Sequence, residues 1–254
     1  MRNPQHILIT GASSGIGAAL ASRYAAPGIR LSLHGRNQDR LTEVAAHAAR
    51  AGAVVTTKVC DVTDSAPITT WLNESNQVQP IDLVIANAGI SAGTGRGFEN
   101  TDQAKKIFDV NVDGVFNTVN PAVALMIKRQ YGQIAILSSL ASFRGFAGSA
   151  AYCASKAAVR IYGEALRSEC LSHGIEVNVI CPGFVKTPMT DANRFRMPFL
   201  MSVERAAEII QNGLSANKAR IAFPWPLYWA IRLLAALPHD WTIQLTSRLP
   251  KKGI

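Results

Sequence analysis

Cysteine is scarce in this sequence, and the cysteines that occur lack the spacing of a metal or disulfide site. They are Cys60, Cys153, Cys170 and Cys181, with no Cys-x-x-Cys pair and no histidine spaced to complete a metal cage. The sequence therefore predicts neither a structural zinc nor a disulfide framework. Because disulfides belong mainly to secreted proteins, we expect this chain in a reducing cytoplasm.

The sequence also lacks a signal-peptide pattern, a long apolar run and a run of basic residues, although its formal net charge is +9. Met1 and Arg2 lead into polar residues instead of an apolar core with a small-residue cleavage site, so we expect no export. The charge-free stretch at 221–231 is too short to span a bilayer. Acidic residues are interspersed among the basic ones, which argues against a nucleic-acid partner.

The chain does have enough apolar residues for a large core, since 48% of its 254 residues are hydrophobic and 17% are charged. Short runs rich in Ile, Leu and Val predict strands at 6–10, 29–34, 53–59, 81–86, 133–138, 175–180 and 220–223. Helical spacing predicts helices at 16–26, 38–51, 66–76, 102–130, 152–172 and 203–216. Continuous apolar runs are typical of strands covered on both faces. The alternation therefore predicts one α/β domain over 1–254, with a doubly wound parallel sheet of about seven strands and helices on both faces.

A glycine-rich turn follows the first predicted strand, at residues 10–17 with the sequence Thr-Gly-Ala-Ser-Ser-Gly-Ile-Gly. Gly11 permits a tight exit from the strand, Gly15 lets the backbone approach a pyrophosphate, and Gly17 lets the next helix pack closely. The N–H groups at the start of that helix would face the anion, with Ser13, Ser14 and Ile16 as further contacts. Any strand-to-helix turn can use glycine, so the turn alone is weak evidence.

The end of the second predicted strand carries Gly35 and Arg36, where an adenosine ribose would lie if the turn holds a pyrophosphate. An acidic residue there would select NAD(H), whereas Arg36 can pair with a 2′-phosphate. This favours NADP(H) over NAD(H), although Arg36 can equally be a solvated loop cation. Asp61 can cap a turn or accept from an adenine amino group. The same carboxyl edge of the sheet also carries Val62, Asn87, Ala88 and Gly89.

The sharpest pattern is Tyr152-x-x-x-Lys156, because residues four apart on a helix share a face and can converge on one point. Tyrosine ionises near pH 10, and a cation held close by is expected to draw that pKa toward neutrality. The phenol would then serve as a proton donor and acceptor. The pair follows the fifth predicted strand, whose end carries Ser139, so a serine hydroxyl can meet the phenol.

In this order, the glycine turn, the Asn-Ala-Gly element and the Tyr-x-x-x-Lys pair make the chain resemble the short-chain dehydrogenase/reductase family over about residues 5–187. The resemblance implies a Rossmann-like fold. It implies that Ser139, thirteen residues before Tyr152, hydrogen-bonds the substrate oxygen. It also implies that Asn111 bends its helix and holds a water linking Lys156 to solvent, while Lys156 binds the nicotinamide ribose.

The same resemblance implies hydride transfer between a nicotinamide and a carbonyl or carbinol carbon, with no metal required. Tyr152 would move the proton and Ser139 would stabilise the oxyanion. Relatives pair through the helices near Asn111 and Tyr152, which implies a homodimer or homotetramer. The implied nicotinamide-carboxamide site comprises Pro182, Gly183, Val185 and Thr187.

The C-terminal extension, 218–254, departs from the family, because it lacks the Asp-Gly-Gly turn with which many relatives end. It is apolar, aromatic and basic, with six Lys or Arg against one Asp, a surplus of five. We expect its helical part to pack over the substrate pocket or a partner subunit, and the alternative is peripheral contact with a membrane. A lid at 189–201 would close the pocket. Candidate lining residues are Phe143, Phe146, Phe195, Phe199 and Trp225.

Together these patterns predict an NADP(H)-dependent oxidoreductase that acts on a carbonyl or secondary alcohol of an apolar or lipid-like small molecule. An epimerase or dehydratase with bound nicotinamide is a second enzymatic interpretation. The alternative outside catalysis is a catalytically silent NADP(H)-binding sensor or a membrane-docking protein.

Overall fold

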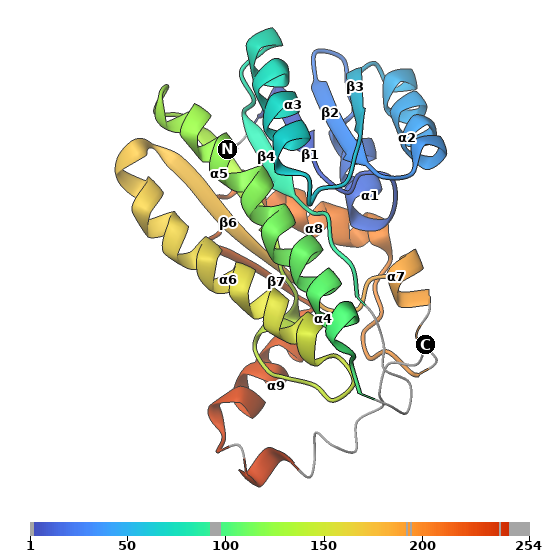
Figure 1. Ribbon diagram of the computed structural model, residues 1–254, viewed down its shortest axis with the longest axis vertical. Helices are drawn as coiled ribbons and strands as arrows, with labels where there is room; N and C mark the ends of the chain where they lie inside the picture. Colours follow the sequence, from blue (N-terminus) through green and yellow to red (C-terminus); the bar gives the residue numbers. More distant parts are fainter. Residues whose placement is uncertain (1–2, 92–97, 192, 194, 239, 244–254) are drawn as a thin grey trace.

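A seven-stranded parallel sheet forms the centre of the protein in the computed structural model, which describes residues 3–91, 98–191, 193, 195–238 and 240–243 (Figure 1). The strands are β1 (His6–Ile9), β2 (Arg30–Gly35), β3 (Val54–Val59), β4 (Leu83–Ala86), β5 (Gly132–Leu137), β6 (Ile175–Pro182) and β7 (Arg220–Phe223). Their order is β3-β2-β1-β4-β5-β6-β7, and all neighbours are parallel. The predicted α/β sheet is confirmed.

Helices cover both faces of this sheet (Figure 1). One face is covered by α1 (Gly15–Tyr24), α2 (Gln38–Arg50) and α8 (Val203–Ser215). The other is covered by α3 (Ser65–Val78), α5 (Gly114–Ile127) and α6 (Ala150–Cys170). Shorter elements are α4 (Thr101–Phe108), η2 (Leu140–Ser142), η3 (Leu171–His173) and α7 (Pro188–Asp191), and α9 (Trp225–Ala236) follows β7. Among the described helices, none combines the length and apolarity needed to cross a membrane.

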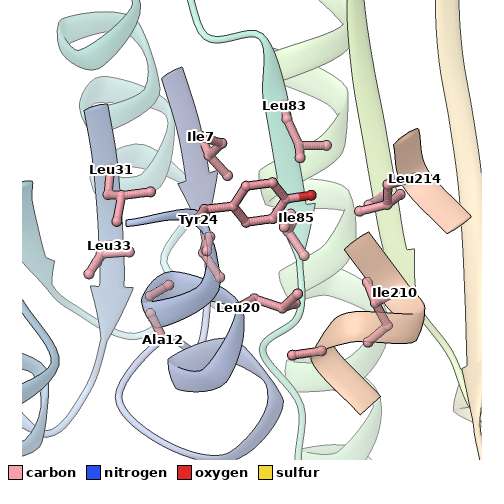
Figure 2. Packing of buried hydrophobic residues seen from close by; sticks show 14 of the residues in the cluster. Ile7, Ala12, Leu20, Tyr24, Leu31, Leu33, Leu83, Ile85, Ile210 and Leu214 are labelled. Atoms are coloured by element: carbon pink, nitrogen blue, oxygen red, sulfur yellow. The ribbon is translucent and has the colours of Figure 1, made fainter. Parts of the chain in front are cut away.

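The core consists of two layers, one on each side of the sheet, because successive strand residues point to opposite faces. Ile7 and Ile9 belong to the cluster with α1 and α8, whereas Leu8 belongs to the cluster with α3, α5 and α6. Figure 2 shows the first layer, where Leu20 of α1 and Ile210 of α8 pack against the central strands. The two layers therefore cover the central strands on both faces.

The expectation that every strand is buried on both faces is wrong for β3. Its exposed residues include Val54 and Val59, which are 52% and 40% exposed. The strand order explains the difference, since β3 lies at the edge of the sheet and pairs only with β2. Helices cover an edge strand less completely than the strands at the centre.

The helix predicted at 102–130 is three segments instead of one. α4 ends at Phe108, a π-helical turn, η1 (Asp109–Asp113), follows, and α5 begins at Gly114. A π-helical turn inserted between α-helices locally changes which residues face the core, and such turns are frequent at functional sites. The turn contains Asn111, which is fully buried.

The order of the strands determines where a ligand can bind. β1 is paired with β2 on one side and β4 on the other, so the chain winds outward in both directions from this point. In open parallel sheets of this kind, ligands bind outside the carboxyl ends of the strands beside this reversal. The glycine turn follows β1, and the Asn-Ala-Gly element follows β4. Both therefore lie where a ligand is expected.

Leu20→Ala is expected to lower the free energy of unfolding by about 2–5 kcal/mol, because Leu20 is fully buried between α1 and the sheet. Leu171→Ala is the matched control, since Leu171 is 80% exposed, and it is expected to change stability by no more than about 0.5 kcal/mol. Urea unfolding of both variants measures the difference. Equal effects would contradict the described core.

Candidate active site

A cavity of about 600 Å³ opens at the carboxyl edge of the sheet. Most residues predicted to hold a cofactor line it: Gly11, Ser13, Ser14, Gly15, Ile16, Arg36, Val62, Asn87, Ala88, Gly89, Tyr152, Lys156, Pro182, Gly183, Val185 and Thr187. Ser139 lines it as well. Gly17, Asp61 and Asn111 are absent from the lining, and each instead contacts residues that form it. Residues from several strand ends and helices thus meet at one cavity.

The glycine turn has the backbone conformation that its residues predict. Gly11 and Gly15 have φ values of +68° and +54°, which favour glycine. A Cβ on Gly17 would lie 2.3 Å from the carbonyl oxygen of Gly11, so only glycine fits there. Ser14 caps α1 without a side-chain capping bond, and it lines the cavity. The start of α1 therefore presents N–H groups and a hydroxyl to the cavity.

Asn87 connects this turn to the end of β4. Its Nδ2 donates to the carbonyl oxygens of Thr10 at 2.9 Å and Gly11 at 3.0 Å. The Thr10 hydroxyl in return accepts from the backbone N–H groups of Asn87 and Ala88, at 3.1 and 3.3 Å. These bonds fix the ends of β1 and β4 against each other.

Arg36 lies at the end of the cavity beside β2, with a second arginine close by. Its guanidinium forms an ion pair with Asp61 at 3.4 Å, in which both side chains are partly exposed. Burial raises the pKa of the Asp61 carboxyl, but hydrogen bonds from Thr63 and the charge of Arg36 outweigh it and lower the pKa. Asp61 therefore caps a turn and orients Arg36. Arg40, in the first turn of α2, also lines the cavity.

Lys156 is a buried cation at the base of the cavity. The residue is 3% exposed, and its Nζ donates to the carbonyl oxygen of Leu137 at 3.0 Å. Burial lowers the pKa of Lys156 to about 8. The absence of a side chain at Gly89 makes room for this ammonium group, because a Cβ there would lie 3.1 Å from Nζ.

Tyr152 lies one helical turn before Lys156 and lines the same cavity. Burial raises the pKa of its phenol, and a hydrogen bond with Ser139 acts in the opposite direction without overcoming it. The expected shift toward neutrality is therefore wrong. The Lys156 ammonium lies 6.0 Å from the centre of the Tyr152 ring and donates to the Leu137 carbonyl. Desolvation of the phenolate therefore outweighs the attraction of the Lys156 charge.

Asn111 acts on the loop after β4. Its Oδ1 accepts from the backbone N–H of Ile90 at 2.8 Å, and its Nδ2 donates to the Ile90 carbonyl at 2.9 Å and to the Ser155 hydroxyl at 3.0 Å. The side chain therefore joins the π-helical turn, the loop after β4 and α6. A π-helical turn lies at Asn111, and the implied bend and the implied water both stay predictions.

The segment after β6 forms the opposite wall of the cavity. Val185 pairs with Met201 through a parallel bridge, and its carbonyl accepts from the Thr190 hydroxyl at 2.7 Å. Thr187 faces the glycine turn, because a Cβ on Gly15 would lie 3.1 Å from its Cγ2. Two residues of the predicted lid, Met189 and Thr190, line the cavity; residues 192 and 194 of that lid lie outside the described residues.

The five aromatic residues predicted to line a substrate pocket do not line this cavity. Phe143 and Phe146 line a separate cavity of about 550 Å³ beside the start of α6. Phe195 packs edge-to-face on Phe184, with ring centres 5.9 Å apart. Phe199 and Trp225 are exposed. Tertiary packing, which composition does not reveal, directs these rings elsewhere.

The sequence reasoning missed several residues that line the cavity. Arg40 was identifiable, since it follows Arg36 by four residues at the start of a predicted helix. His34 precedes the glycine-arginine pair, and its Nδ1 accepts from the Gly11 N–H at 3.5 Å. Nothing in the local sequence identifies Ile90, whose placement depends on Asn111.

Comparison with known proteins agrees with this geometry. The profile of a family described as short chain dehydrogenase matches residues 5–197. An uncharacterized oxidoreductase of Myxococcus xanthus is 37% identical over 233 residues, which is 91% of this chain and 92% of that protein.

Two solved structures resemble the fold at 25% identity. One is a variant of actinorhodin polyketide ketoreductase with NADPH, with a TM-score of 0.77 over 88% of this chain and 97% of that one. The other is a short chain dehydrogenase of Mycobacterium paratuberculosis bound to NAD, with a TM-score of 0.76 over 86% and 94%. The profile match over most of the chain and the Myxococcus relative establish that this protein belongs to the short-chain dehydrogenase/reductase family and is an oxidoreductase.

Proposed function

We propose that this oxidoreductase uses NADPH to reduce a carbonyl group on an apolar small molecule. The observation that carries the proposal is that Ser139, Tyr152 and Lys156 line the same cavity as the glycine turn. A dinucleotide lying along that cavity would extend from the turn after β1 to the end of β5. Its reactive end would then meet the hydroxyl groups of Ser139 and Tyr152.

The described residues fit such a dinucleotide. Side chains are missing where a pyrophosphate would approach: a Cβ on Gly11 would lie 2.8 Å from the Cα of Ala88, and one on Gly15 would lie 3.1 Å from Thr187. Ser14 and the first N–H groups of α1 supply donors for the phosphates. Val185 and Thr187 would contact the carboxamide. When bound, the reduced nicotinamide supplies a hydride.

The protein's own residues supply the proton. The Tyr152 hydroxyl is protonated at neutral pH, since burial raises a pKa that is ordinarily near 10, and it can donate this proton to the carbonyl oxygen of a substrate. Ser139, which contacts the phenol, would orient that oxygen and donate a hydrogen bond to it. A protonated phenol is the form that the reduction of a carbonyl requires. Lys156 would hold a ribose hydroxyl.

The preference for NADPH rests on Arg36 and Arg40. Both line the end of the cavity where the adenosine ribose would lie, and a 2′-phosphate could bond to both guanidinium groups. Asp61, which pairs with Arg36 at 3.4 Å, is absent from the cavity lining, so it leaves room for the phosphate. A carboxylate lining that end would favour NAD(H) instead.

We further propose that the substrate is lipid-like and that the enzyme forms a homodimer or homotetramer in the cytoplasm. Apolar residues such as Ile90 and Met189 line the cavity near the polar groups, which favours an apolar substrate. A sensor that binds NADPH without turnover has the same cavity, so turnover separates the two functions. A peripheral membrane contact would involve α9.

Tyr152→Phe is expected to lower kcat for ketone reduction on the order of 10²–10⁴-fold, because the proton donor is lost. The affinity for NADPH should change only a few-fold. Tyr162→Phe, on the same helix, is the control. The Tyr162 hydroxyl donates to Asn120 Oδ1 at 2.6 Å, and neither residue lines the cavity. Oxidation of NADPH with a panel of ketones measures kcat. Unchanged turnover in Tyr152→Phe would refute the assignment, and binding without turnover by the unmodified protein would favour the sensor.

Arg36→Ala and Arg40→Ala are each expected to raise the Kd for NADPH about tenfold or more while leaving the Kd for NADH nearly unchanged, because a charged hydrogen bond contributes about 1.5–3 kcal/mol. Arg50→Ala is the control, since Arg50 is exposed in the last turn of α2. Fluorescence titration with both nucleotides measures the ratio. An equal loss for NADPH and NADH would remove the argument for a 2′-phosphate site.

The pH dependence should follow Lys156. Below its pKa of about 8 the ammonium is charged and attracts the nucleotide; above it the charge is lost, so kcat/KM for NADPH should fall as the pH rises through about 8. Tyr152 stays protonated there because its pKa is raised. Steady-state rates from about pH 6 to about pH 10 measure the profile. A kcat/KM that increases across this range would contradict the assignment.

A further inference from the structure

Helix α9 is apolar around most of its circumference, yet the described chain covers only one of its faces. Between residues 225 and 236, Arg232 is the one charged residue. The inner face, with Leu227, Tyr228 and Ile231, packs against a cluster that includes Leu140 and residues of β6. A helix that is hydrophobic on all sides is normally covered by a protein core or by lipid.

The outer face carries three large exposed side chains, which we call the outer stripe: Trp225, Trp229 and Leu233. They are 73%, 61% and 67% exposed, and their spacing of four residues places them on one side of the helix. Figure 1 shows α9 outside the two helical layers that cover the sheet. The outer stripe is therefore an apolar surface at the periphery of the molecule.

Positive charge gathers beside the inner face of α9, around Phe143, which packs on Tyr228. The guanidinium groups of Arg160, Arg220 and Arg232 lie 4.6, 5.3 and 5.6 Å from the centre of the Phe143 ring, at the base of α9. Glu164 forms ion pairs with Arg160 and Arg220, which leaves a surplus of two positive charges from three arginines and one glutamate. The sequence has no acidic residue from 209 to 239.

Apolar area and positive charge together indicate which kind of partner binds the outer stripe. Trp side chains prefer the headgroup level of a bilayer, and Arg attracts anionic lipid. At 12 residues, α9 is about 18 Å long, which suits a helix lying along an interface. A second protein is a poorer fit, since the outer stripe offers on the order of 400 Å² and a stable interface needs about 800 Å² from each partner.

We propose that α9 docks the protein on a membrane surface that bears anionic lipids, with the outer stripe in the interfacial region and Arg232 at the headgroups. The inner face of α9 links this surface to the cavity: a Cβ on Gly183, which lines the cavity, would lie 3.2 Å from Leu227. Docking would thus hold the open edge of the sheet close to a store of lipid-like molecules. The proposal stands without the proposed reaction, because binding to vesicles needs no turnover.

Co-sedimentation of the full chain with vesicles tests the proposal. The protein should sediment with vesicles of phosphatidylcholine and phosphatidylglycerol, and less with phosphatidylcholine alone. The double variant Trp229→Ser, Leu233→Ser should lose at least tenfold in affinity for the mixed vesicles. Leu171→Ser is the control, because Leu171 is also exposed but lies in η3, outside α9, and it should bind as the unmodified protein does.

A second variant changes a single exposed side chain, so that a loss of vesicle binding does not depend on a loss of folding. Arg232→Gln removes one exposed charge and should lower affinity for the mixed vesicles about fivefold, with a weaker dependence on salt. Quenching of tryptophan fluorescence by brominated lipid should occur in the unmodified protein. Absence of binding and quenching, or equal binding by the double variant, overturns the proposal. A lower mass of the double variant in light scattering also overturns it, because the outer stripe would then join two copies of the chain.

Discussion

The side chain of Asn87 holds together the part of the molecule on which the cavity depends. Its amide bonds to the carbonyls of Thr10 and Gly11 join the glycine turn to the end of β4. Gly17 makes this arrangement possible, because any side chain there would collide with the Gly11 carbonyl and the Asn87 amide. If these bonds were lost, α1 would move away from the carboxyl edge, and its N–H groups would no longer face the cavity.

A second constraint fixes the other end of the cavity. Gly89 leaves space for Asn111 and Lys156, each 3.1 Å from where a Cβ would lie. Asn111 then holds the Ile90 backbone, while the Leu137 carbonyl accepts from the Lys156 ammonium. The burial that these contacts produce lowers the pKa of Lys156, and burial of the neighbouring phenol raises its pKa. Packing therefore keeps the phenol protonated.

Much of this arrangement follows from local sequence. The strands and the glycine turn are predictable because apolar periodicity and positive-φ glycines act over a few residues. The convergence of Tyr152 and Lys156 is predictable because residues four apart share a helix face. The exposure of β3 was not predictable, since it depends on the order of strands. The pKa direction of Tyr152 and the π-helical turn also depend on tertiary contacts, such as those between Asn111 and Ile90.

α9 shows the same limit at the C-terminal end. The sequence predicts an apolar helix there, but only the structure separates the face that packs on η2 and β6 from the face that carries the two exposed tryptophans. The α9 surface depends on apolar area with positive charge nearby. The cavity depends on the packing of glycines and on buried hydroxyl groups. Leu227, which packs against the cavity wall at Gly183, connects them.

Transfer of deuterium from labelled NADPH to a ketone tests the central claim most directly, because it follows the hydride itself. The protein would be mixed with NADPH deuterated at the transferable position of the nicotinamide, and with ketones of increasing apolar length. If the cavity places the nicotinamide against Ser139 and Tyr152, the alcohol should carry one deuterium on its carbinol carbon. An alcohol without that deuterium, or NADPH that binds and is never oxidised by any ketone, would contradict the account.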